Sequence, residues 1–421
     1  IVTASVDSLG LADMDWWQVY GDSTLTRVIR RVLDNNRDML IATARIAELG
    51  ELYGVDKLVY LPTVTGIAGA TRETNHYSGQ KFTIDTEVSF KATVNWELDL
   101  WGGQGAQRRR SGALYRASIE DRRALQMQLI AQTATAYFNL MALEAELDIV
   151  NRTLVTRREG VEKARLRYEG GLTSELVYQQ AKVELATTEA LLPALESRII
   201  MARNAITLLM GEFPDTEFGK PNVDIMQVRP RQFPATVSSE LLERRPDLRA
   251  SELRLQAALE AVGVAYSNQF PKLRIAVTGG FENDQVANLF KSPFSYLLGN
   301  IAGTILDFGR NHRRYKASVD AYEQARLGYE KSVLTAFTEV SDAIAVYNSI
   351  RRTVERRTEL RDAAFEYVTL ANRQYIGGTI SYIDVLDAYR RYFDAQTSLI
   401  YAVRDEYLSM VNVYKALGGG A

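Results

Sequence analysis

An almost unbroken alternation of apolar and polar residues runs from Phe82 to Asp99. Its apolar face carries Phe82, Ile84, Thr86, Val88, Phe90, Ala92, Val94, Trp96 and Leu98. A period of two predicts a β-strand with one apolar and one polar face. The run has about 18 residues, against about 5–6 in a common strand and about 9–11 in a membrane-crossing one. It is therefore long enough to span a bilayer; the alternative is a long amphipathic strand in a soluble sheet.

Three more strands are predicted. The alternation returns near 271–283, where Leu273, Ile275 and Val277 alternate with polar residues. Weaker strand signals lie near 61–73 and 294–306. The strands therefore form two pairs, one in each half of the chain.

The rest of the chain predicts long helices. Residues 63–192 and 294–421 contain no proline, and proline is what most often breaks a helix. An uninterrupted helix from Gln104 to Tyr168 would approach ~100 Å. Two runs have the spacing of a coiled-coil seam: Leu143, Leu147, Val150 and Leu154, and Ile400, Val403, Tyr407, Met410, Tyr414 and Leu417. Pro193 lies inside a predicted helix, where we expect a kink or a break.

The two halves of the chain resemble each other. An offset of 209 matches Gly54 with Gly263 and Pro62 with Pro271, and an offset of 207 matches Tyr168 with Tyr375. We therefore predict a first repeat over 1–210, with strands near 61–73 and 82–99 and a helical hairpin over 100–210. An irregular segment over 211–240 follows. A second repeat over 241–421 has strands near 271–283 and 294–306 and a hairpin over 307–418.

Four strands cannot close a barrel, and an open sheet edge in lipid leaves backbone groups unpaired. The smallest single-chain outer-membrane barrels have about eight strands. Several chains must therefore share one barrel. The residues alone do not decide between two, three or four chains.

Composition excludes several classes of function. The 50 basic and 52 acidic residues nearly cancel, which argues against nucleic-acid binding. The chain has no cysteine and two distant histidines, His76 and His312, so we predict no catalytic residue, metal site or cofactor. No apolar stretch is long enough for a spanning helix.

Several motifs resemble those of TolC-like outer-membrane efflux factors, and of the OprM-like branch in particular. These motifs are Met14–Trp17, Leu241–Arg249, and the strand-to-helix segments Leu98–Gly102 and Leu306–Gly309. The resemblance covers about residues 13–418, and its Arg244–Asp247 segment is specific.

The resemblance implies a mostly α-helical fold with a β-barrel. It implies a homotrimer in which four strands per protomer build a shared twelve-stranded barrel, above an α-barrel of helical hairpins. It also implies a channel in the outer membrane of a Gram-negative bacterium, extending into the periplasm. Its partners would be the lipid bilayer, a periplasmic adapter protein and an inner-membrane transporter of the RND type. The cargo would be drugs or other small molecules.

The hairpin tip in the second repeat is the predicted gate. Asp384 and Asp387 are three residues apart and lie on one helix face. They match paired aspartates that ring the closed entrance in the family, and Tyr375 matches a gate tyrosine. Rings of carboxylates attract cations; the alternative is a solvated helix start with ordinary acidic residues.

Two positions depart from the family pattern. Ile380 stands where relatives carry a charged residue, so an apolar ring is one hypothesis for closure. Val177 occupies the first-repeat position equivalent to Asp384. The turns at the two tips match those that receive the adapter, although plain turns are an equal reading: Gly170, Gly171, Leu172 and Thr173 in the first, and Gly377, Gly378 and Thr379 in the second.

Three other functions remain as alternatives. A duct for secreted proteins fits the same architecture. A coiled-coil scaffold does not explain the alternation from Phe82 to Asp99. A soluble enzyme that works through carboxylates would need converging acids, and only Asp384 and Asp387 offer them.

Overall fold

The computed structural model describes residues 22–76, 78–79, 81–214, 216–219, 225–226, 244–303 and 307–419. In chain order its elements are α2 (Ser23–Asn35), α3 (Arg37–Leu58), β1 (Thr63–Asn75), β2 (Thr83–Leu98), α4 (Gly103–Glu169), α5 (Glu175–Glu189), α6 (Leu192–Leu209), α8 (Pro246–Ser267), β3 (Lys272–Asn283), η1 (Val286–Lys291), β4 (Pro293–Ala302), α9 (Arg310–Ile376) and α10 (Tyr382–Ala416). The Met14–Trp17 motif and most of the segment 211–240 lie outside the described residues.

The chain divides into two compact units, and each unit draws on both halves of the sequence. A strand unit comprises residues 44–120 and 249–332. A helical unit comprises residues 1–43, 121–248 and 333–421. The long helices α4 and α9, with 67 residues each, contribute to both units.

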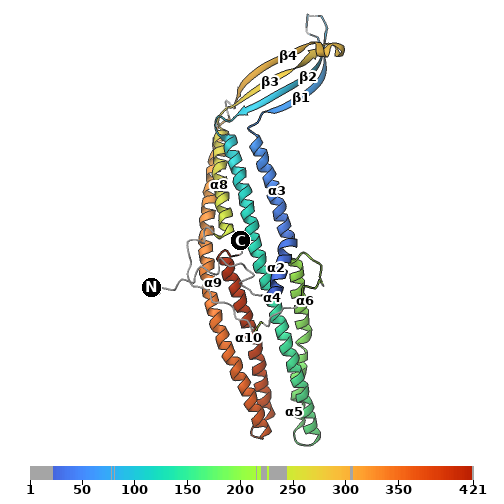
Figure 1. Ribbon diagram of the computed structural model, residues 1–421, viewed down its shortest axis with the longest axis vertical. Helices are drawn as coiled ribbons and strands as arrows, with labels where there is room; N and C mark the ends of the chain where they lie inside the picture. Colours follow the sequence, from blue (N-terminus) through green and yellow to red (C-terminus); the bar gives the residue numbers. More distant parts are fainter. Residues whose placement is uncertain are drawn as a thin grey trace, which may run out of the picture. The chain divides into compact units, whose positions relative to one another are not determined.

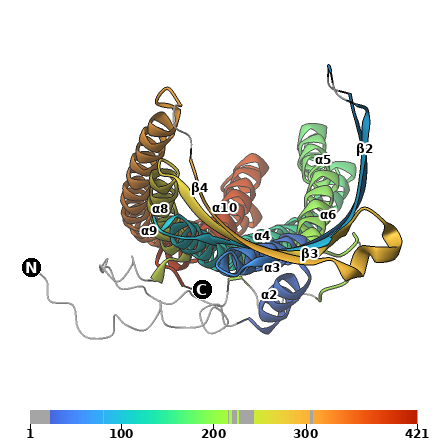
Figure 2. The same ribbon diagram turned by 90° about the horizontal axis from the view of Figure 1, so that it is seen from above.

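The strand unit contains one antiparallel sheet with the order β1-β2-β3-β4 (Figure 1). The β2–β3 pairing joins the strand pairs of the two halves, with Phe90 opposite Phe281. Figure 2 shows that the sheet curves into an arc. All four strands lie within a few residues of where the alternation predicts them.

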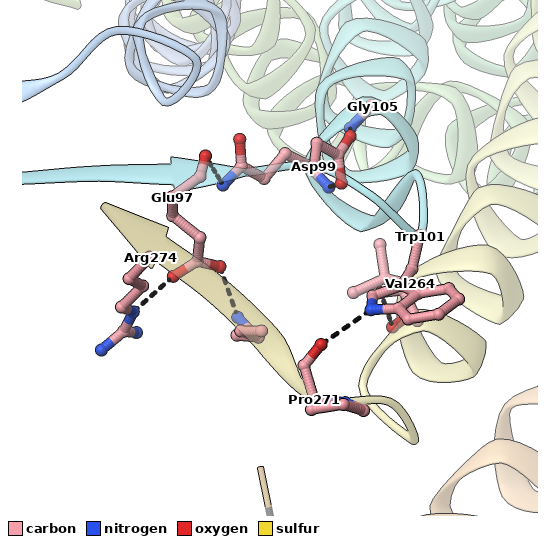
Figure 3. A network of polar contacts seen from close by, with 10 residues as sticks. Glu97, Asp99, Trp101, Gly105, Val264, Pro271 and Arg274 are labelled. Atoms are coloured by element: carbon pink, nitrogen blue, oxygen red, sulfur yellow. Dashed lines mark hydrogen bonds and ion pairs between the residues drawn. The ribbon is translucent and has the colours of Figure 1, made fainter. Parts of the chain in front are cut away.

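An aspartate ends the strand region in each half and caps the long helix that follows. Asp99 accepts hydrogen bonds from the backbone N–H groups of Gln104 (2.9 Å) and Gly105 (2.8 Å), as Figure 3 shows for Gly105. Asp307 accepts them from Gly309 (2.9 Å) and Asn311 (2.8 Å), and these amides lower the pKa of its carboxyl. Free N–H groups at a helix start favour a carboxylate in this way.

Two indole rings fix the same strand-to-helix region. Trp101 donates to the carbonyl of Pro271 at 2.7 Å (Figure 3). Its ring also stacks on Phe270. Trp96 donates to the carbonyl of Tyr60 at 3.0 Å. Their N–H groups therefore bind neighbouring turns of this chain.

The core of the helical unit packs α2, α4, α9 and α10 together. Phe138 of α4 and Tyr407 of α10 stack with ring centroids 4.5 Å apart. Leu25 of α2 and Tyr347 of α9 belong to the same buried cluster. Such pairs contribute attraction beyond the burial of apolar area.

The Arg244–Asp247 motif joins three helices of this unit. Arg245 is buried at the start of α8 and pairs with Asp247 (2.7 Å) and with Glu339 of α9 (2.7 Å). It also donates to the carbonyl of Ala416 at the end of α10. A planar guanidinium with several donors suits this junction.

The break predicted at Pro193 is confirmed. Helix α5 ends at Glu189 and α6 begins at Leu192, with the proline in the first turn of α6. The ring has no N–H to lose there, since the first N–H groups of a helix have no intrahelical partner. The first hairpin therefore returns in two pieces, whereas α10 returns in one.

We expect Tyr137→Phe to destabilise the helical unit by about 1–3 kcal/mol. The fully buried Tyr137 hydroxyl donates to Asp22 at 2.8 Å, and the same carboxylate caps α2. Without that donor one buried carboxylate oxygen loses its partner. Thermal unfolding of the purified protein measures the effect, with Tyr367→Phe as an exposed control. Equal unfolding temperatures for the two variants would contradict this assignment.

Candidate functional site

The two hairpin tips have the same backbone turn. In the first, Leu172 N–H donates to the carbonyl of Arg167 and Gly171 N–H to that of Tyr168. In the second, Thr379 and Gly378 repeat the pattern with Gln374 and Tyr375. This is a Schellman motif, which needs a residue with positive φ after the helix. Gly171 (φ 69°) and Gly378 (φ 74°) supply it.

The predicted adapter-docking residues lie on the surface of these turns. Gly170, Gly171 and Leu172 are exposed, Thr173 is half-buried, and Gly377, Gly378 and Thr379 are exposed. The Leu172 side chain is 73% exposed. A large apolar side chain at the end of a hairpin is available to a partner.

The predicted gate aspartates have different partners. The exposed Asp384 accepts hydrogen bonds from the Ser381 N–H (2.9 Å) and hydroxyl (2.7 Å), in a capping box at the start of α10. Asp387 forms an ion pair with Arg391 at 2.7 Å. Within the described part of the chain no cationic side chain pairs with Asp384, whereas Arg391 partly compensates the charge of Asp387.

Tyr375 and Ile380 lie inside the second hairpin. Tyr375 contacts Tyr382 with ring centroids 5.4 Å apart, and the Arg167 guanidinium lies 5.2 Å from the Tyr375 ring. Ile380 is half-buried against an apolar cluster of α9 and α10 that includes Val368 and Val385. Both residues thus contribute to packing within one protomer.

A link between the two hairpins is the feature that the sequence pattern did not reveal. Glu184 of α5 pairs with Arg157 of α4 (2.6 Å) and with Arg390 of α10 (2.5 Å). We call these three residues the hairpin bridge. They are far apart in sequence, so no short motif connects them. Glu184 raises the pKa of Arg390 by accepting its hydrogen bond.

A cavity of about 650 Å³ lies beside the hairpin bridge, between the two hairpins. Its lining includes Arg157, Glu184, Tyr375, Tyr382, Tyr389 and Phe393. Burial raises the pKa of the Tyr382 hydroxyl, so this phenol stays neutral at physiological pH. Near the tips the two hairpins therefore meet through the hairpin bridge and a tyrosine-rich space, and farther along Tyr401 of α10 bonds to Glu146 of α4 and Arg198 of α6.

The described residues contain no group of three acidic or histidine side chains that could bind a metal ion. Within the same part of the chain, no helix is long and apolar enough to cross a membrane.

Comparison with known families gives two matches along the chain. The model of the family described as "Outer membrane efflux protein" matches residues 28–212 and again residues 237–419. The chain belongs to the outer membrane efflux protein family. The double match also confirms the internal duplication.

Relatives of this efflux protein align over almost its whole length. The solvent efflux pump outer membrane protein SrpC of Pseudomonas putida is 30% identical over 96% of this chain and 87% of its own. The pyoverdine export outer membrane protein OpmQ of Pseudomonas aeruginosa is 27% identical, over 96% of this chain and 87% of its own.

Solved channels have the same fold. The outer-membrane channel OprN superimposes with a TM-score of 0.87 at 27% identity, over 99% of this chain and 96% of its own. The open state of the Neisseria gonorrhoeae channel MtrE superimposes with a TM-score of 0.87 at 26% identity, over 99% of this chain and 94% of its own. The predicted fold class is confirmed: helical hairpins and four strands per protomer that contribute to a trimeric barrel. The efflux protein is an outer-membrane channel that extends into the periplasm.

We expect Asp384→Ala to loosen the first turn of α10, at a cost of about 1 kcal/mol. The alanine accepts neither the Ser381 N–H nor its hydroxyl. Asp384→Asn keeps an amide oxygen as acceptor, so the backbone amides of this turn should keep most of their protection against hydrogen exchange. Hydrogen exchange of the amides at 381–385 measures the difference, and equal exchange in the alanine variant and the parent would exclude the capping role.

Proposed function

We propose that three copies of this chain form the passive exit duct of a tripartite efflux pump and that the duct opens when the two hairpins of each protomer separate. Small molecules would enter from a periplasmic adapter and an inner-membrane RND transporter, and no catalytic step would be involved. Family membership and the pump names of the relatives support this proposal. The hairpin bridge is the observation on which its mechanism depends.

The hairpin bridge joins charged groups that lose free energy of stabilisation when they are buried without a partner. The side chains of Arg157 and Glu184 are 10% and 14% exposed, and the Nε of Arg157 is buried without a hydrogen-bond partner. Removing one partner of a buried ion pair costs about 3–5 kcal/mol, because the remaining charge has lost both water and its counter-ion. Loss of Glu184 would therefore favour any state in which Arg157 reaches water.

Glu184 also controls the second hairpin through Arg390. That guanidinium is more than half exposed, so its pair with Glu184 contributes less than the buried one. This weaker contact is the one that must break for α10 to move away from α5. An adapter that binds the nearby tips at Leu172 and Gly378 would act on this contact between α5 and α10.

The gate residues have complementary roles in this proposal. Three copies of Asp384 and of Asp387 would form two carboxylate rings at the entrance, and the Asp384 ring would be the more negative. Tyr375 and Ile380 would shape the wall behind the rings, since both pack within the second hairpin. Cation preference would thus arise at the entrance and closure at the hairpin bridge.

The turns Gly170–Thr173 and Gly377–Thr379 would receive the adapter. Their shared Schellman geometry presents two similar ends to one partner. An exposed apolar side chain lies at each tip and would contact the adapter, Leu172 at the first and Ile376 at the second.

Glu184→Gln is expected to increase the open probability and conductance of single channels in planar bilayers. The amide cannot neutralise Arg157 or Arg390, so the hairpins should separate more often. Glu159→Gln is the matched control, since Glu159 is exposed and pairs only loosely with Lys163 at 4.0 Å. Conductance that is the same in both variants and the parent would refute the bridge as the closing contact.

The double variant Asp384→Asn, Asp387→Asn should conduct with a weaker preference for cations. Each asparagine removes a charge and keeps an acceptor, so the capping of α10 remains while the electrostatic attraction is lost. Reversal potentials in a salt gradient measure the preference. An unchanged reversal potential would place the selective region elsewhere in the duct.

A further inference from the structure

The polar face of the sheet carries an aromatic pair that the alternation does not explain. Strand register sets Phe294 opposite Gly280 and Tyr296 opposite Thr278. In the next pairing Gly280 lies opposite Lys91 and Thr278 opposite Thr93. Residues directly opposite each other share a face of the sheet. Phe294 and Tyr296 therefore lie on the face of Lys91 and Thr93, and we call the two rings the aromatic ledge.

Side-chain contacts support this assignment of faces. The Lys91 Nζ lies 5.8 Å from the centroid of the Phe294 ring, across the position of Gly280. The hydroxyls of Thr93 and Thr278 are 3.0 Å apart. Both contacts are the ones that this register predicts.

The ledge faces the duct and not the lipid. In a membrane barrel the apolar face is turned outward and the polar face lines the lumen. Strand β4 has apolar residues on both faces, with Leu297 and Ile301 on the outward one. Lipid contact explains those two residues but leaves the aromatic ledge without a reason to be apolar.

The geometry of the aromatic ledge suits a planar ligand. Its rings are inclined by only 14° to each other, with centroids 6.2 Å apart. The neighbouring strand places two small residues opposite the rings, the half-buried Gly280 and the buried Thr278. A side chain cannot be added at position 280, because its Cβ would lie 2.2 Å from the carbonyl oxygen of Phe90. Tyr296 is 53% exposed in the single protomer, so this chain leaves much of its ring uncovered.

The charges around the ledge favour a cation. Glu87 and Glu282 bind Lys91 at 3.0 and 3.2 Å, which leaves two carboxylates to one ammonium. Farther along the same face Glu73 lies directly opposite Asp85. Aromatic ring faces attract cations, and an excess of carboxylates adds to that attraction.

From this arrangement we propose that the aromatic ledge binds planar aromatic cations as they pass through the barrel. The aromatic ring of the ligand would stack on Tyr296 and Phe294, and its positive charge would lie toward Glu282 and Glu87. The proposal rests on the proposed function in one respect, since it requires that the polar face line the path of the cargo.

Ethidium fluorescence anisotropy tests the site on the purified trimer in non-ionic detergent, with empty micelles as the blank. The parent should bind ethidium, and Phe294→Ala with Tyr296→Ala should bind it roughly tenfold more weakly. Leu297→Ala is the matched control: it lies on the same strand but on the outward face, and should bind like the parent. Pyrenesulfonate, a planar aromatic anion, should bind the parent at least about tenfold more weakly than ethidium.

Each other outcome counts against the site. No ethidium binding by the parent, or equal binding by the double variant, would overturn the ledge as a binding site. Equal binding of pyrenesulfonate would overturn the preference for cations. Circular dichroism and trimer migration on gels show whether the double variant has folded, and Tyr296→Ala alone replaces it if it has not.

Single-channel conductance of the same samples separates this proposal from the proposed function. A parent that conducts but does not bind ethidium contradicts the ledge alone. A folded trimer that does not conduct even with Glu184→Gln contradicts the duct.

Discussion

The pairing of backbone hydrogen-bonding groups in lipid is the constraint on which the rest of this structure depends. One chain supplies a four-stranded sheet whose outer strands, β1 and β4, each have a neighbour on one side only. In hydrocarbon the N–H and C=O groups of a free edge have no water to bind. The edge of β4 must therefore pair with β1 of another copy. The sheet satisfies its backbone groups in the membrane only when the copies have assembled.

The same constraint explains why the strand-to-helix region is so strongly connected. Strands β2 and β4 run in the same direction, and each is followed by a helix of 67 residues, α4 and α9. Asp99 and Asp307 cap these helices, and Trp96 and Trp101 bind the carbonyls of adjacent turns. These polar contacts fix the first turns of both long helices next to the turns that surround them.

Local pattern predicted much of the fold. The alternation from Phe82 to Asp99 predicted β2, and Pro193 predicted the break between α5 and α6. Both features depend only on residues close together in the sequence. The hairpin bridge could not be predicted in this way, since Glu184 and Arg390 are 206 residues apart. Ile380 was expected to contribute an apolar ring across protomers; the structure shows it packed within its own hairpin, and its role in closure stays a prediction.

The interruption between α5 and α6 makes the two halves of each protomer mechanically different. Duplication alone would give a trimer six equivalent hairpins and a nearly sixfold tunnel. One hairpin of each pair has a joint at Ala190–Leu191, whereas its counterpart returns through the unbroken α10. In a trimer, three hairpins with a joint between α5 and α6 therefore alternate with three hairpins whose returning helix α10 is continuous.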